Sequence, residues 1–217
     1  MVIFDCNGVL VDSEPIAAAV AAEEFSRVGL PMTVDIIARY FTGRRSADML
    51  AAVEAATRRK LPVNFGTELT AATLRRFRSE LRATPHIAYA LTWLRGPKCV
   101  ASSSTHDRIR VSLETTGLLR FFEHNIFSAS EVPQGKPAPD LLLYAAAKMG
   151  VQASDCIVVE DSAPGIAAAR AAGMVPIGYV GKLDDASMGA NLMAAGARTL
   201  NADMRQLKST VVALRGW

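Results

Sequence analysis

Val2-Ile3-Phe4, a short apolar run followed at once by Asp5-Cys6-Asn7-Gly8, is the stretch that decides the fold. Similar short runs rich in β-branched residues recur at residues 99–101, 125–127, 157–159 and 175–179. Most of these runs precede a helix-like segment, and strands that alternate with helices in this way form a parallel sheet covered by helices. The sequence therefore predicts an α/β fold whose sheet contains these five runs.

Two helices of this predicted fold have their own end signals. Asp140 lies between a proline-rich turn and an apolar segment, so we expect it to be the N-cap of a helix that ends at Gly150. We expect a second helix over residues 163–172, ending at Gly173.

Residues 15–81 differ from the rest of the chain. They contain no strand-like run and are rich in alanine, arginine and apolar residues at helical spacing. This pattern predicts an all-helical module inserted after the first strand. We expect residues 1–13 and 83–217 to form the α/β core and residues 14–82 to form the inserted domain. The basic clusters at residues 58–60 and 75–78 are predicted to face solvent.

The composition excludes several classes of protein. The chain has 217 residues, 50% hydrophobic and 21% charged, which excludes an intrinsically disordered protein. Its longest apolar runs fall short of the ~20 residues of a membrane-spanning helix, and its first residues do not suit a signal peptide. The net charge of +3 is too small to indicate nucleic-acid binding. We therefore expect a cytoplasmic monomer or weak dimer that binds neither membrane nor nucleic acid.

The cysteines and histidines lack the spacing of a metal site or a catalytic triad. Because each cysteine adjoins a strand-like run, we expect all three to be buried, reduced thiols. They are Cys6, Cys99 and Cys156. The histidines, His86, His106 and His124, are predicted to lie on the surface or in loops.

Polar side chains follow several of the predicted strands, at the edge of a parallel sheet where catalytic groups gather. Asp5 follows the first strand, a hydroxyl cluster at residues 102–105 follows the second, and Glu160 and Asp161 follow the fourth. Lys136 lies in a turn between the last two groups. Carboxylate oxygens suit Mg²⁺, and a lysine with hydroxyls suits phosphoryl oxygens. This set of residues therefore points to phosphate chemistry.

The stretch from Phe4 to Glu14 resembles the first motif of the haloacid dehalogenase superfamily, Asp-x-Asp-Gly-x-x-x-Asp. The other motifs follow in the expected order: the strand ending at Ser102, the loop Gly135-Lys136-Pro137, and the segment at residues 158–162. The chain is similar to the β-phosphoglucomutase-like phosphatases of that superfamily. The resemblance implies a Rossmann-like parallel sheet with an all-helical cap inserted after the first strand.

The resemblance also implies roles for individual residues. Asp5 matches the nucleophile, which forms an aspartyl-phosphate intermediate, and Ser102 and Lys136 match the residues that bind the transferring phosphoryl group. The expected Mg²⁺ ligands are Asp5, the backbone carbonyl of Asn7, Glu160 and Asp161. The further residues expected to contact a small phosphorylated metabolite are Ser13, Glu14 and Ser103.

The segment at residues 41–50 is similar to the part of the cap that faces the active site. Ser46 stands where β-phosphoglucomutase has an arginine for a second phosphate, which weakens a mutase interpretation. Arg44 and Arg45 precede it and suit an anionic substrate group. A solvated cap loop is the alternative interpretation of these two arginines.

The sequence departs from the family pattern at residue 7, where Asn7 replaces the aspartate that acts as general acid and base. An amide can donate a hydrogen bond but cannot transfer a proton, so we expect catalysis to be impaired. Either this chain is a substituted copy of an active phosphatase, or the asparagine is native and the protein binds phosphorylated ligands or catalyses different chemistry. A mutase remains open as a third alternative. A dehalogenase fits less well because it does not need Glu160 and Asp161.

Overall fold

The computed structural model describes residues 1–41, 46–181 and 186–215. Its centre is a six-stranded, wholly parallel sheet with the strand order β3-β2-β1-β4-β5-β6. The strands are β1 (Val2–Phe4), β2 (Lys98–Ser102), β3 (Ile126–Ser128), β4 (Ile157–Glu160), β5 (Val175–Tyr179) and β6 (Thr199–Asn201). The predicted α/β fold and its five strands are confirmed, whereas β6 was not predicted.

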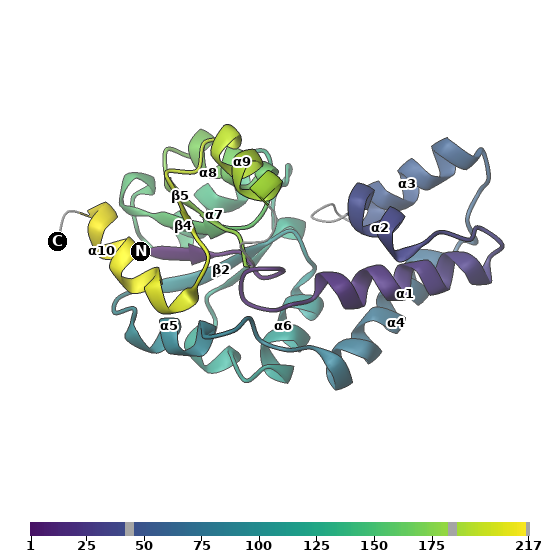
Figure 1. Ribbon diagram of the computed structural model, residues 1–217, viewed down its shortest axis with the longest axis horizontal. Helices are drawn as coiled ribbons and strands as arrows, with labels where there is room; N and C mark the ends of the chain where they lie inside the picture. Colours follow the sequence, from purple (N-terminus) through teal and green to yellow (C-terminus); the bar gives the residue numbers. More distant parts are fainter. Residues whose placement is uncertain (42–45, 182–185, 216–217) are drawn as a thin grey trace.

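Helices cover both faces of the sheet (Figure 1). They are α5 (Ile87–Trp93), α6 (His106–Thr115), α7 (Asp140–Lys148), α8 (Ala163–Ala171), α9 (Ala186–Ala195) and α10 (Leu207–Arg215). Short 3₁₀ turns are η1 (Leu119–Phe121), η2 (Ala129–Glu131), η3 (Ala153–Asp155) and η4 (Met204–Gln206). Side chains alternate across β1: Val2 and Phe4 pack in the core on the α5, α6 and α10 face, and Ile3 packs on the α7 and α8 face. Both faces of β1 are therefore buried, as a parallel sheet requires.

Four helices extend to one side of the sheet (Figure 1). They are α1 (Glu14–Arg27), α2 (Val34–Phe41), α3 (Ser46–Thr57) and α4 (Phe65–Glu80). They enclose a hydrophobic core of their own, in which the rings of Phe25 and Phe65 lie 4.9 Å apart. Small residues such as Ala18 and Ala21 on the buried side of α1 allow its neighbours to approach closely. We refer to residues 14–82 as the cap, and its boundaries stay a prediction.

The predicted C-terminal ends of α7 and α8 are confirmed, whereas the predicted N-cap of α7 is wrong. Gly150 and Gly173 follow α7 and α8 with φ angles of +65° and +71°, which glycine adopts without strain. Asp140 is not the N-cap of α7 but its first residue, because Pro139 occupies the cap position. At this position its carboxylate interacts favourably with the positive N-terminal end of the helix dipole.

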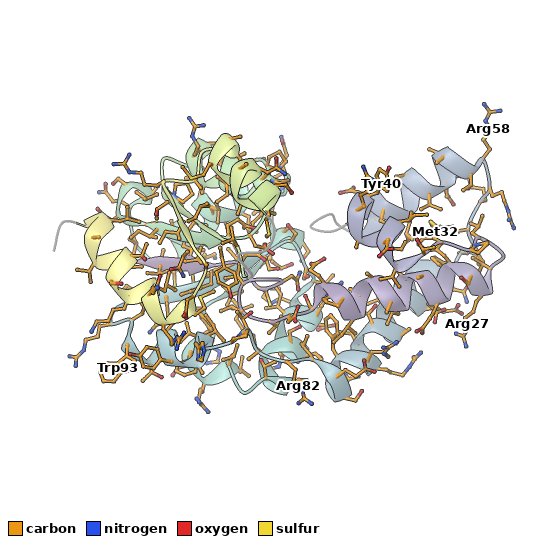
Figure 2. The ribbon with its side chains drawn as sticks, in the orientation of Figure 1. Arg27, Met32, Tyr40, Arg58, Arg82 and Trp93 are labelled. Carbon is orange, nitrogen blue, oxygen red and sulfur yellow. The ribbon has the colours of Figure 1, made fainter. Side chains whose placement is uncertain are left out.

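Surface and buried positions agree with several predictions. The three cysteines are buried and free, and the three histidines are exposed. Arg58 and its two basic neighbours are exposed, and Arg58 points away from the protein at the far end of the cap (Figure 2). Within residues 75–78, Arg75 and Arg78 are exposed, whereas Phe77 is buried. Among the described residues, no helix has the length and apolar character to cross a membrane.

Candidate active site

The loop that leaves β1 carries Asp5 to the edge of the sheet. The amide of Asp5 donates a hydrogen bond of 3.0 Å to the carbonyl of Val159 on β4, which ties the ends of the two strands together. The chain then folds back on itself, since the amides of Leu10 and Val11 both donate to the carbonyl of Cys6. Asp5 is therefore held on a tight turn and is only 6% exposed.

Three carboxylates meet at this edge. One oxygen from each of Asp5, Glu160 and Asp161 lies within 4.8 Å of the other two. Glycines make room for this group: a Cβ on Gly8 would lie 1.8 Å from Oδ2 of Asp161, and one on Gly165 would lie 2.0 Å from Cδ of Glu160. Gly8 also has a φ angle of +73°, which other residues rarely adopt. The local backbone is thus built to let carboxylates approach one another.

One buried cation balances part of their charge. The ammonium of Lys136 donates to Oδ1 of Asp5 at 2.7 Å, to Oε2 of Glu160 at 2.6 Å and to the carbonyl of Ala101 at 3.1 Å. Burial lowers the pKa of Lys136, but the charges of Asp5 and Glu160 more than offset that effect, so the pKa lies above its ordinary value. Lys136 therefore stays protonated in the site.

The carboxylates respond to burial in the opposite direction. Burial raises the pKa of Asp5 to about 7, with Lys136 opposing and Glu160 adding to the shift. Burial, followed by the charges of Glu160 and Asp5, raises the pKa of Asp161 well above its ordinary range. Three carboxylates against one ammonium leave an excess of negative charge that a divalent cation would neutralise. The hard oxygen donors of this cluster fit Mg²⁺.

Asn7 is held by two hydroxyl groups beside this cluster. Its Nδ2 donates to Oγ of Ser104 at 2.9 Å, and its Oδ1 accepts from Oγ of Ser13 at 3.1 Å. Both hydroxyls can also donate to a carboxylate oxygen. The surroundings of residue 7 would therefore accept an aspartate without rearrangement.

A cavity of about 880 Å³ opens over these groups. Its walls come from the strand ends, from the four cap helices α1, α2, α3 and α4, and from α9. Asp5, Lys136, Glu160 and Asp161 line it from the core side, and Glu14 lines it from the start of α1. A small molecule in this cavity would touch the carboxylate cluster and the cap at the same time.

The comparisons with known proteins agree with this geometry. A family model for a hydrolase family, described as haloacid dehalogenase-like hydrolase, matches residues 1–173. The chain belongs to this family. The 6-phosphogluconate phosphatase of Escherichia coli (strain K12) is 29% identical over 174 residues, which cover 80% of this chain and 79% of that protein. The phosphorylated carbohydrates phosphatase of Thermotoga maritima is 29% identical over 203 residues, which cover 92% of each chain.

Solved structures give the same family. A haloacid dehalogenase-like protein from Agrobacterium tumefaciens superposes with a TM-score of 0.83 at 34% identity, covering 99% of this chain and 98% of that one. A family hydrolase from Deinococcus radiodurans, solved with bound phosphate and sodium, has a TM-score of 0.78 at 31% identity, covering 98% of this chain and 94% of that one. The predictions of a haloacid dehalogenase fold and of a phosphoric monoester hydrolase are confirmed at this level.

In this haloacid dehalogenase-like hydrolase, the residues predicted to bind substrate occupy different places. Ser103 and Glu14 line the cavity, whereas Ser13 and Ser102 are buried and are not part of its described lining. Ser13 bonds Asn7, and Oγ of Ser102 accepts from the amide of Ser104 at 3.3 Å. Their roles toward substrate stay predictions. Arg44 and Arg45 lie outside the described residues.

Arg108 was missed in the sequence, and no individual role was assigned to Ser104 or Ser162, two members of the polar groups predicted after the strands. Ser104 bonds Asn7, and Arg108 in the first turn of α6 lines the cavity. Ser162 donates to Oε1 of Glu160 at 2.7 Å while it caps α8 by accepting from the amide of Gly165. Each lies within the loop or first helical turn after a strand. That position indicates Ser104 and Ser162, whereas the contact of Arg108 with Phe77 is tertiary and has no local signal.

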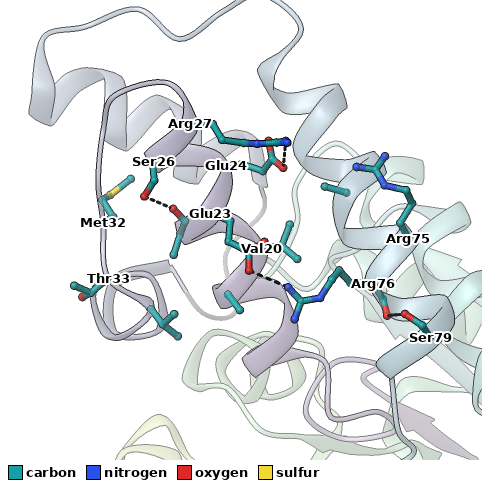
Figure 3. A pocket seen from close by; sticks show the side chains of 14 residues that line it. Val20, Glu23, Glu24, Ser26, Arg27, Met32, Thr33, Arg75, Arg76 and Ser79 are labelled. Carbon is teal, nitrogen blue, oxygen red and sulfur yellow. Dashed lines mark hydrogen bonds and ion pairs between the residues drawn. The ribbon is translucent and has the colours of Figure 1, made fainter.

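A second cavity, of about 890 Å³, lies within the cap between α1, the start of α2 and α4 (Figure 3). Two of its arginines are already paired: Arg27 with Glu24 at 3.0 Å, and Arg76 with Glu23 at 3.0 Å. Its described lining contains no carboxylate cluster like the one at the strand ends. The chemistry of the site therefore belongs to the cavity over Asp5.

We predict that Gly8→Ala weakens Mg²⁺ binding about 10–100-fold, measured by isothermal titration calorimetry, because the new methyl group displaces Asp161. Gly150→Ala is the matched control, since Gly150 has a similar φ angle of +65° with open space around its Cα. It should lose about 1–2 kcal/mol of stability from backbone strain and keep its Mg²⁺ affinity. Unchanged Mg²⁺ affinity in Gly8→Ala would contradict this description of the site.

We predict that Lys136→Met lowers the free energy of unfolding by about 3–5 kcal/mol in metal-free buffer, measured by urea denaturation. The substitution leaves Asp5 and Glu160 buried without their cation. Adding Mg²⁺ should restore part of the loss, because ligand binding to the folded state stabilises it. Lys60→Met, which breaks an exposed pair with Glu54, should cost less than about 1 kcal/mol. Equal losses for the two variants would rule out a structural role for the buried pairs.

Proposed function

We propose that this protein hydrolyses the phosphate ester of a small phosphorylated metabolite, a sugar or sugar-acid phosphate, through an aspartyl-phosphate intermediate. The observation that carries the proposal is the cluster of Asp5, Glu160, Asp161 and Lys136 in the wall of the cavity. The names of its relatives support the substrate class. They include the 6-phosphogluconate phosphatase and the fructose-1-phosphate phosphatase of Escherichia coli.

Mg²⁺ is the proposed cofactor. The residues that would hold it are Asp5, Glu160, Asp161 and the backbone carbonyl of Asn7. When bound, the ion would neutralise charge on the phosphoryl oxygens. The excess of carboxylates over cations in the cluster supports this assignment. A bound divalent cation would lower the raised pKa values of Asp5 and Asp161, so that both groups would be ionised.

The chain's own residues divide the work of the reaction. An oxygen of Asp5 would attack phosphorus, forming the Asp5–phosphorus bond as the bond between phosphorus and the ester oxygen breaks. Lys136 bonds only one oxygen of Asp5, which leaves the second available. Water would then release phosphate and restore the Asp5 carboxylate. Both steps need a proton transferred, to the leaving oxygen and from the water.

Asn7 is expected to slow both of these steps. Its amide can donate a hydrogen bond toward the leaving oxygen, yet it supplies no proton and accepts none from water. This observation also favours a second candidate function, a protein that binds phosphorylated metabolites without turnover. The complete carboxylate cluster and the hydroxyls that would accept an aspartate favour an impaired phosphatase over that alternative.

The cap is proposed to close the site over the substrate. The two crossings between core and cap lie side by side: the amide of Asp12 donates to the carbonyl of Arg82, and the amide of Thr84 donates to the carbonyl of Leu10. This pairing supports boundaries at residues 13/14 and 82/83. Two adjacent crossings form a narrow hinge on which the cap can open for substrate and close to exclude water.

We predict that Asn7→Asp raises Mg²⁺-dependent release of inorganic phosphate at least ~10²-fold, because it restores a group that can transfer a proton in both half-reactions. The assay is a panel of phosphorylated sugars, sugar acids and nucleotides, with Mg²⁺ and with chelator. Asp5→Asn in the Asn7→Asp background is the control and should abolish the activity. Equal rates for the parent chain and Asn7→Asp would refute this account of residue 7, and ligand binding without turnover in both would support the non-catalytic alternative.

A further inference from the structure

Arg108 lies in the wall of the active-site cavity, at the junction of core and cap. Arg108 belongs to the first turn of α6, directly after the hydroxyl-rich loop that leaves β2. Its Cζ lies 5.0 Å from the centre of the buried ring of Phe77 on cap helix α4. One turn before Phe77, Thr73 lines the same cavity. The arginine therefore reaches from the core to the cap wall of the cavity.

Among the residues that the structure describes, no carboxylate is hydrogen-bonded to this cation. Its Nε is buried and has no hydrogen-bond partner among the residues that the structure describes. Burial lowers the pKa of Arg108, and the charge of Glu14 offsets only part of this effect. Buried polar groups in proteins are almost always hydrogen-bonded. The guanidinium is thus placed to receive an anionic group that enters the cavity.

The other two cations of the described cavity lining, Lys136 and Arg39, already contact other side chains. Lys136 is bonded to Asp5 and Glu160. Arg39 is exposed, with its guanidinium over the ring of Tyr40. Among the cations of the described lining, Arg108 is therefore the one best placed to contact the part of a substrate that faces the cap.

The local charge favours a carboxylate over a second phosphate. Glu14 lines the cavity and acts electrostatically on Arg108. A phosphate dianion beside Glu14 would meet more repulsion than a carboxylate, which carries a single charge. A carboxylate also matches the planar fork of the guanidinium with two parallel hydrogen bonds. Phe77 would hold the plane of that fork in place.

We propose that Arg108 binds a carboxylate at the end of the substrate remote from the phosphate that is removed, so that the substrate class is a phosphorylated sugar acid. The proposal rests on the phosphatase function proposed above and narrows it. Arg108 contacts the substrate directly and sets specificity, and it takes no part in the transfer of the phosphoryl group.

The test is a comparison of two ligands that differ only at the carboxylate. Calorimetric titrations in Mg²⁺ would compare 6-phosphogluconate with glucitol 6-phosphate, in which a hydroxymethyl group replaces the carboxylate. The parent chain should bind the acid more tightly than the polyol. Arg108→Gln should weaken binding of the acid about 10–100-fold, because charge-assisted hydrogen bonds are lost, and change binding of the polyol less than about 3-fold.

Two further variants separate recognition from packing. Arg108→Lys keeps the charge but not the fork, so it should give an intermediate loss for the acid. Arg108→Lys also tests the role of Arg108 if the Arg108→Gln variant fails to fold. Arg110→Gln alters an exposed arginine of the same helix, paired with Glu114, and should leave both affinities unchanged.

Three results would overturn the proposal. They are equal affinities of the parent chain for the acid and the polyol, equal losses for both ligands in Arg108→Gln, and a larger loss for fructose 1,6-bisphosphate than for the acid. Failure of the phosphatase function is recognised separately: Asn7→Asp would then release no phosphate from either ligand, while the difference in binding would still decide the role of Arg108.

Discussion

The ion pairs of Lys136 with Asp5 and Glu160 are the interaction on which the rest of this structure depends. They bring two carboxylates to one buried ammonium, at 2.7 and 2.6 Å, while a third carboxylate, Asp161, lies close by. Carboxylates crowded in this way repel one another and lose hydration. The fold must therefore hold them in place, and the side-by-side pairing of β1 and β4, with glycines at the points of closest approach, does so.

The core is proposed to carry the groups that act on phosphorus, and the cap is proposed to contact the rest of the substrate. The groups proposed to act on phosphorus come from the ends of parallel strands, where the backbone is fixed by the sheet. Helices of the cap line the cavity above them, so the remainder of a substrate would face α1, α2 and α4. Arg108 belongs to both environments, because its backbone lies in the core and its guanidinium packs on Phe77 of the cap.

Much of this could be predicted from the sequence, because the decisive residues are close in sequence to strands with strong apolar signals. Asp5 and Asp161 directly follow such a strand and Glu160 is the last residue of one, and parallel pairing then brings them together. The strand β6 was not predictable in the same way, since Thr199–Asn201 is a short edge strand with an exposed Leu200. The position of Arg108 was missed because its environment depends on Phe77, a tertiary contact that no local pattern encodes. The N-cap of α7 was misplaced by one residue because Pro139 occupies it.

The central claim is that Asp5 accepts the phosphoryl group. The most direct test is to mix the parent chain with Mg²⁺ and p-nitrophenyl phosphate, whose leaving group needs no proton, and to follow nitrophenolate release and protein mass together. Because Asn7 cannot activate the water of the second step, the account predicts a rapid burst stoichiometric with the chain and a phosphoryl group on Asp5 in the fragment spectrum. Steady release without a burst, with no label or with the label on another residue, would contradict it.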